Sequence, residues 1–160
     1  SVMHGEPEIQ IRPLTFADFP SVCILMQALH TNHIALRPDL YRAVDPVLSA
    51  EEFCEYLHHD MAYGAVSSGE LCALSLFRTL QIDAPEQVPR RIFRLDALVV
   101  REEERHRGIA RALLQKGKEL AAKGEYTSFE LQVNAANETA KKLYAACGFS
   151  EKSINMEYIL

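Results

Sequence analysis

The sequence predicts one α/β domain in which helices cover both faces of a central mixed sheet. The chain has 160 residues, of which 48% are hydrophobic, so it can bury one sizeable core but is too short for two ordinary domains. Its apolar patterns follow the order strand, helix, helix, three strands, helix, strand, helix, strand. We place the domain at residues 8–160 and expect residues 1–7 to form a flexible N-terminal tail.

The first elements are a strand and a helix. Residues 9–12 alternate as a short strand. Thr15, with Asp18 three residues later, has the pattern of a capping box, and apolar residues at helical spacing extend the helix over about 16–29. A short helix around residues 39–42 is also expected.

The middle of the chain predicts a helix and three strands. Ser49 precedes an acidic first turn and predicts a helix that ends near Asp60. Residues 62–66 and 71–80 flank a turn and predict a hairpin, and residues 93–100 form an apolar run typical of a buried strand.

The last third alternates helices and strands. An apolar stripe through Ile109, Leu113, Gly117 and Leu120 predicts a helix that stops at Gly124. A strand at 129–133, a helix from Glu138 and a closing strand at 153–160 follow.

Composition limits the functional classes. The net charge of −5 argues against a general nucleic-acid binder, and no apolar run is long enough to cross a membrane. Without a secretory signal, a cytoplasmic protein is expected. The cysteines are scattered among apolar neighbours and are expected to be small buried hydrophobes, and the histidine pairs lack the further ligands of a metal site: Cys23, Cys54, Cys72, Cys147, His30, His33, His58, His59.

The segment from Phe93 to Arg111 combines a strand, a basic glycine turn and a helix start. Backbone N–H groups at a helix N-terminus have no partners within the helix and carry the positive end of its dipole. Arg105, Arg107 and Arg111 add positive charge around Gly108. The junction therefore suits a phosphate group.

A second motif follows the strand at 129–133. It consists of Asn137, Ala140, Tyr144, Gly148 and Phe149, with the spacing Asn-x-x-Ala-x-x-x-Tyr-x-x-x-Gly-Phe. Together with the spacing Arg-x-x-Gly-x-Ala from residue 105 to residue 110, it resembles the two signatures of the GNAT superfamily of N-acyltransferases.

The resemblance carries expectations about fold and activity. It implies a single-domain GNAT-like fold with a mostly antiparallel central sheet and a splay between the fourth and fifth strands. It also implies an N-acetyltransferase that moves acetyl from acetyl-CoA, as co-substrate, to a primary amine of a small molecule or peptide in a ternary complex. The resemblance requires no metal, nucleic acid or membrane, and a homodimer is common in the family.

The resemblance also assigns residues to acetyl-CoA. The backbone of Leu98, Val99 and Val100 would bind the pantetheine arm as an added strand would. The pyrophosphate would bind the turn, where a side chain at residue 108 would block its approach: Arg105, His106, Arg107, Gly108, Ile109, Ala110, Arg111. Asn137 would help to hold the arm, and capping the following helix is an equally compatible role.

Two residues are predicted to be catalytic. Tyr144 matches the family position that protonates the leaving thiolate, although it could instead be an aromatic ring that packs against the core. Asp96 is the only acid within the apolar run, and it is either the general base or the partner of Arg94 in an ion pair. Glu130 is a weaker substitute for the base.

The acceptor site is expected near residues 26–60. Candidate lining residues are polar or aromatic, although ordinary surface polarity explains them too: His30, Asn32, His33, Arg37, Tyr41. A non-catalytic acyl-CoA sensor is the alternative function, and a nucleotide-phosphate binder is disfavoured because the turn lacks the P-loop lysine.

Overall fold

The computed structural model describes residues 8–160, in which five strands form one sheet in the order β1-β2-β3-β4-β5. The strands are β1 (Ile9–Pro13), β2 (Ala62–Ser67), β3 (Glu70–Ile82), β4 (Arg90–Val100) and β5 (Ser128–Glu130). Neighbours are antiparallel except β4 and β5, which are parallel. The predicted α/β class and mostly antiparallel sheet are confirmed. The tail expected at residues 1–7 lies outside the described residues.

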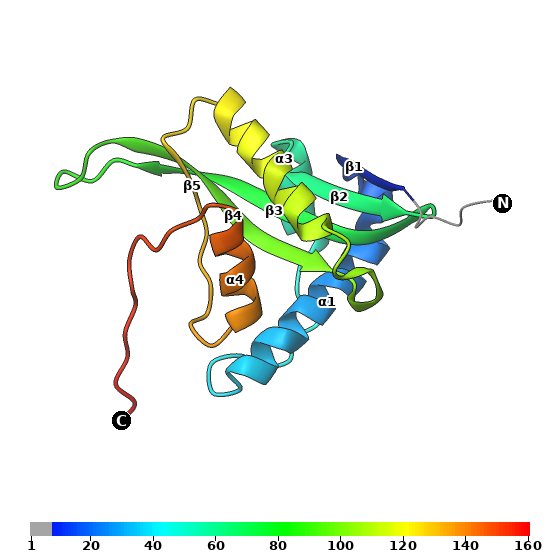
Figure 1. Ribbon diagram of the computed structural model, residues 1–160, viewed down its shortest axis with the longest axis horizontal. Coiled ribbons are helices and arrows are strands. Elements are labelled where there is room, and N and C mark those ends of the chain that lie inside the picture. The colour runs from blue at the N-terminus through cyan, green and yellow to red at the C-terminus, as the bar shows by residue number, and fades with distance from the viewer. Residues whose placement is uncertain (1–7) are drawn as a thin grey trace.

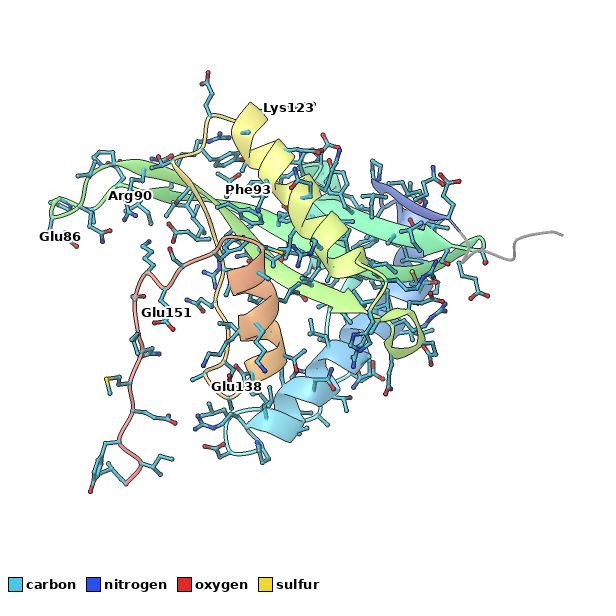
Figure 2. All side chains as sticks on the ribbon, viewed as in Figure 1. Glu86, Arg90, Phe93, Lys123, Glu138 and Glu151 are labelled. Carbon is cyan, nitrogen blue, oxygen red and sulfur yellow. The ribbon has the colours of Figure 1, made fainter. Side chains whose placement is uncertain are left out.

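Helices cover both faces of this sheet, as predicted (Figure 1). One face carries α1 (Phe19–Leu36) and α2 (Ala50–His58), and the other carries α3 (Ile109–Lys123) and α4 (Glu138–Ala146). Each face has its own buried cluster, with Phe53 and Leu74 among the buried side chains of the first and Phe77, Phe93 and Leu113 among those of the second. Figure 2 shows Phe93 between the sheet and α3.

The helix boundaries follow the predicted caps, with one extension. Thr15 and Asp18 form the expected capping box, which opens a short 3-10 turn (Phe16–Asp18) before α1. The helix then continues to Leu36 rather than Leu29, and its C-cap, Arg37, is the residue that precedes Pro38. A residue before proline is disfavoured in the helical region, which explains this end. No helix forms at 39–42, where the chain makes a turn.

The end of the chain differs from the prediction. The strand expected at 129–133 is limited to its first two residues, because β5 pairs with β4 only from Ser128 to Glu130. The closing strand at 153–160 is wrong, since residues 151–160 are extended, exposed and without a partner strand among the described residues (Figure 1). Two ion pairs hold this segment: Lys152 pairs with Glu130, and Glu157 pairs with Arg37. An extended segment becomes a strand only where neighbouring backbone completes its hydrogen bonds.

A bulge in β4 places the side chains of the site. Opposite it, Leu76 pairs with Ala97 and Phe77 pairs with Leu95, so Asp96 is the extra residue. Before the bulge, Phe93 and Leu95 pack on the α3 side. After the bulge the alternation is reversed, so that residues 97 and 99 pack on the α1 side and residues 98 and 100 on the α3 side.

The cysteines only partly match the expectation of burial. Cys72 and Cys147 are buried, Cys23 is half-buried and Cys54 is exposed on α2. The apolar neighbours of Cys54 in the sequence lie on the other side of this helix, where Phe53 enters the core.

Candidate functional site

A cleft of about 410 Å³ opens where β5 leaves β4. Its walls are the C-terminal half of α1, the middle of β4, the segment after β5, and α4: Leu29, His33, Leu36, Tyr41, Arg94, Leu95, Asp96, Ala97, Leu98, Gln132, Val133, Asn134, Asn137, Ala140, Tyr144. Beyond Arg94, β4 has no pairing with β5, which produces the splay between the fourth and fifth strands. The β4 backbone here is the edge to which an added strand could bind.

The predicted coenzyme residues of β4 take different positions. Leu98 lines the cleft. Val99 is buried on the α1 side of the sheet, and Val100 is half-buried on the α3 side. A ligand that binds this strand would therefore contact its backbone and the Leu98 side chain.

The turn before α3 has an open, left-handed backbone at Gly108. Its φ is +77°, and a Cβ atom placed there would meet no heavy atom within 4 Å. Glycine is therefore required by the backbone conformation rather than by protein packing, and the space above it is available to a ligand. His106 also has a positive φ, of 66°. No side chain caps the first turn of α3, so the N–H groups of its first three residues are available, whereas Ala112 already donates to the Gly108 carbonyl.

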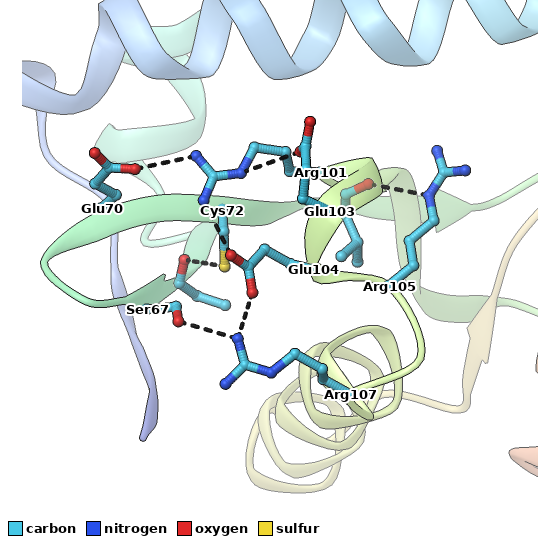
Figure 3. Close-up of polar contacts among 10 residues, drawn as sticks. Ser67, Glu70, Cys72, Arg101, Glu103, Glu104, Arg105 and Arg107 are labelled. Carbon is cyan, nitrogen blue, oxygen red and sulfur yellow. Dashed lines mark hydrogen bonds and ion pairs between the residues drawn. The ribbon is translucent and has the colours of Figure 1, made fainter. Parts of the chain in front are cut away.

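The three arginines of the turn differ in their partners (Figure 3). Arg107 is drawn toward the sheet, where it donates hydrogen bonds to Glu104 and to Ser67 Oγ. Arg107 and Arg101, as hydrogen-bond donors, lower the pKa of Glu104. Arg105 donates a long hydrogen bond of 3.4 Å to the Val100 carbonyl, and Arg111 is exposed. Because Glu104 neutralises Arg107, the positive charge of the turn comes mainly from the other two.

Tyr144 and Asn137 reach the cleft from α4 and its N-cap. Burial raises the pKa of the Tyr144 phenol, so the group keeps its proton at neutral pH. Its ring packs on Phe149, with centroids 5.9 Å apart, and its hydroxyl makes no hydrogen bond within residues 8–160. Asn137 caps α4 through a 3.1 Å hydrogen bond from Ala140 N. The aromatic and capping roles are thus present, and the Tyr144 hydroxyl remains available for chemistry.

Asp96 is held by two hydrogen-bond donors from neighbouring elements and by a longer ion pair within its own strand. Tyr56 on α2 donates to its Oδ2 at 2.6 Å and Arg78 on β3 donates to the same oxygen at 2.5 Å, while Arg94 Nε lies 3.7 Å from Oδ1. The ion pair predicted between Asp96 and Arg94 is therefore longer than the ion pair between Asp96 and Arg78. Tyr56 on α2 and Arg78 on β3 are distant from Asp96 in the sequence, so no local sequence pattern indicates that they contact it.

Glu130 lies outside the cleft lining. It accepts hydrogen bonds from Lys152 at 2.8 Å and Ser128 at 2.6 Å. Burial opposes the ionised form, but these donors together lower the pKa of Glu130. Its partners and its position give it no access to an acceptor in the cleft.

Two of the five candidate acceptor residues line the cleft. His33 and Tyr41 do so, with ring centroids 5.5 Å apart. Burial, together with nearby His30, lowers the pKa of His33 and favours its neutral form. His30 contacts the Arg42 carbonyl at 2.6 Å, and Arg37 pairs with Asp39 and Glu157. His30, Asn32 and Arg37 are therefore near the cleft without lining it.

Comparison with known proteins gives the family. Residues 28–149 match the acetyltransferase (GNAT) family. This protein is a member of that family. The acetyltransferase has its cleft within the matched range, and no curated protein matches the chain.

Solved structures share the fold over nearly the whole chain. A tetramutant of the BH1408 protein from Bacillus halodurans has a TM-score of 0.87 and 26% identity, covering 94% of this chain and 99% of its own. The aminoglycoside N-acetyltransferase AAC(6')-Iy, solved in complex with CoA, has a TM-score of 0.70 and 15% identity, with 99% of both chains covered. An aminoglycoside acetyltransferase from an uncultured soil metagenomic sample, solved with sisomicin, has a TM-score of 0.65 and 13% identity over 95% of this chain and 96% of its own.

Among residues 8–160, no three or more His, Cys, Asp or Glu side chains are grouped as metal ligands. Over the same range, no helix is both long and apolar enough to span a bilayer.

Proposed function

We propose that this protein is an N-acetyltransferase that transfers acetyl from acetyl-CoA to a primary amine of a small molecule or peptide. The observation that carries the proposal is the continuity of the unpaired β4 edge with the open turn at Gly108 at one end and the cleft containing Tyr144 at the other. A thioester with a long phosphorylated arm needs these features in this order. We assign the single catalytic domain to residues 8–160.

The phosphate end of the proposed site uses backbone rather than paired side chains. The free N–H groups at the start of α3 would receive the pyrophosphate, and the helix dipole favours its negative charge. Arg105 and Arg111 add charge, whereas Arg107, tied to Glu104, shapes the turn. His106, Ile109 and Ala110 would contribute main-chain contacts.

The reacting end of the site would need a proton donor for the departing sulfur. Tyr144 is suited to this role because burial favours its neutral phenol, and because its hydroxyl is not committed to another residue of the described chain. A phenol with a pKa near 10 can protonate a developing thiolate. Asn137, at the start of the same helix, would fix α4 beside the coenzyme arm.

The amine must lose a proton before it attacks the thioester carbonyl. We propose His33 for this step, because its imidazole lines the cleft and is held in the neutral form that accepts a proton. Asp96, which the sequence left between two roles, is better explained as the charge partner of Arg78, since one of its oxygens already accepts two hydrogen bonds. We propose direct attack, because the Cys147 thiol is buried and makes no hydrogen bond to a base among residues 8–160.

The decisive experiment compares two glycines with the same backbone. Gly108 and Gly69 both have φ of +77° and open space at the Cβ position, but only Gly108 lies at the proposed phosphate turn. Gly108→Glu and Gly69→Glu should therefore carry similar strain, about 1–2 kcal/mol. Calorimetric titration with acetyl-CoA should show binding to Gly69→Glu and none to Gly108→Glu, and CoA release should occur with a panel of amines.

Three results would change the assignment. Acetyl-CoA affinity that is equal in the two variants would contradict the phosphate turn. Binding without CoA release across a broad amine panel would favour the acyl-CoA sensor instead. Competition by ATP for the same site would favour a nucleotide-phosphate binder.

A further inference from the structure

Two guanidinium groups face each other across the sheet next to the cleft. Arg78 on β3 and Arg94 on β4 are directly paired in the strand register. Like charges in such positions repel each other. Asp96 lies between them as one carboxylate for two cations, at 2.5 Å from Arg78 and 3.7 Å from Arg94.

The two arginines are not equally satisfied. Arg78 donates through Nε to Asp96 and through a terminal nitrogen to the Tyr56 hydroxyl at 3.1 Å. Arg94 has a buried Nε without a hydrogen-bond partner in the described part of the chain. Its nearest contact with Asp96 is too long for a hydrogen bond. Arg94 is the one that lines the cleft.

The charge of the cleft is therefore unusual for a site that takes a cationic amine. Among residues 8–160, Arg94 and Asp96 are the only charged residues of its lining, and Asp96 is already engaged by Arg78, outside the lining. Burial lowers the pKa of His33 and raises the pKa of Tyr144, and both shifts favour the uncharged forms of these two lining groups. A polycationic acceptor would find no free carboxylate in this lining, and it would meet the Arg94 guanidinium, which shares its single carboxylate with Arg78.

We infer that the acceptor carries a carboxylate as well as its amine, and that Arg94 binds this carboxylate. This inference rests on the proposed function and names the substrate class of the same site. The guanidinium fork matches a carboxylate through two parallel hydrogen bonds, which the two terminal nitrogens of Arg94 can donate because they make no hydrogen bond within residues 8–160.

The position of Arg94 also sets the length of the acceptor. Leu98, where the coenzyme arm is expected to end, pairs with Ser75, three residues along β3 from the partner of Arg94, which is about 10 Å at the rise of a strand. The Arg94 side chain shortens this span, but several bonds must still separate the carboxylate from the amine. Free lysine acetylated on its side chain, or a dipeptide acetylated on its N-terminus, fits better than a small α-amino acid acetylated on its α-amine.

The test uses matched acceptors that differ only in the carboxylate. Lysine is compared with 1,5-diaminopentane, and glycylglycine with glycylglycine amide, by CoA release at saturating acetyl-CoA. In the wild-type protein kcat/KM should favour the acid of each pair by about 10- to 100-fold, the range expected for charged hydrogen bonds. Arg94→Gln should bring this ratio close to one, and Arg94→Lys should give an intermediate ratio.

A control variant and a second readout keep the test independent of folding and of turnover. Arg91→Gln removes an arginine of the same strand that contacts Gly124 and the Tyr126 ring, away from the cleft, and should leave the ratio unchanged. Protection against thermal unfolding in the presence of CoA should likewise be greater for the acid of each pair, and should lose this difference in Arg94→Gln.

The failure of this inference is distinguishable from failure of the proposed function. If acetyl-CoA binds but both members of each pair react and protect equally, the carboxylate inference is overturned and acetyl transfer stands. A preference that survives Arg94→Gln would also overturn it. If acetyl-CoA does not bind at all, the proposed function itself fails.

Discussion

Replacing Tyr144 with phenylalanine removes one oxygen atom from the cleft. The hydroxyl makes no hydrogen bond within the described chain, while the ring packs against Phe149. The substitution should therefore change the free energy of unfolding by less than about 0.5 kcal/mol. The affinity for acetyl-CoA should also stay nearly the same, because the phenol is proposed to act on the leaving group only. Turnover should fall roughly a hundredfold, which corresponds to about 2.7 kcal/mol of transition-state stabilisation.

Three measurements separate these effects. Urea denaturation reports stability, calorimetric titration reports acetyl-CoA affinity, and CoA release reports kcat. Tyr126→Phe is the matched control, since the Tyr126 hydroxyl contacts Thr79 Oγ1 at 2.5 Å, outside the cleft lining. That variant should lose about 1 kcal/mol of stability and keep its turnover. An unchanged kcat in Tyr144→Phe would remove this residue from the mechanism.

Three further predictions concern pH, packing and assembly. Because burial lowers the pKa of His33 below 6.5, the unfolded chain binds this proton more readily, so the contribution of His33 to stability is present above about pH 6.5 and is lost as the pH falls. His33→Gln should flatten this loss in urea titrations and should remove the acid limb of the kcat/KM profile. An unaltered acid limb would exclude His33 as the base. Gly117→Ala should lower the free energy of unfolding in urea by about 1 kcal/mol, because the new Cβ would lie 2.7 Å from Phe129 and 2.8 Å from Phe77. The cost of this overpacking should exceed the gain in helix propensity, and a more stable variant would contradict the prediction. Residues 151–160 expose apolar side chains, so we expect light scattering to show a homodimer and to show a monomer after these residues are removed. A full-length chain that is monomeric at all concentrations would refute the prediction of a dimer.

The elements that could be predicted are those with local causes. The caps at Ser49 and Asn137 involve residues three apart, and the turn at Gly108 needs a left-handed residue next to a helix start, so each leaves a signal in the sequence. The end of β5 depends instead on where neighbouring backbone stops pairing with it. The alternation of residues 153–160 suggested a strand, but alternation alone supplies no hydrogen-bonding partner.

The site was predictable in the same uneven way. The positions of Tyr144 and Asn137 follow from a motif, whereas the environment of Asp96 depends on Tyr56 and Arg78, which lie 40 and 18 residues away in the chain. Arg107 carries the same formal charge as its neighbours in the turn, but the fold places it against Glu104. Sequence therefore indicates which side chains carry charge, and the tertiary contacts decide which of those charges a ligand can use.

The extra residue in β4 has a consequence for the tolerance of this strand to insertion and deletion. Removing residue 96 would restore a regular ladder in which Ala97 directly follows Leu95, so every later side chain of the strand would keep its face. The packing of both cores would therefore survive this deletion, and what would be lost is the carboxylate between Arg78 and Arg94. We expect a chain shortened at this one position to fold with both cores intact and with the charge balance of its cleft disturbed.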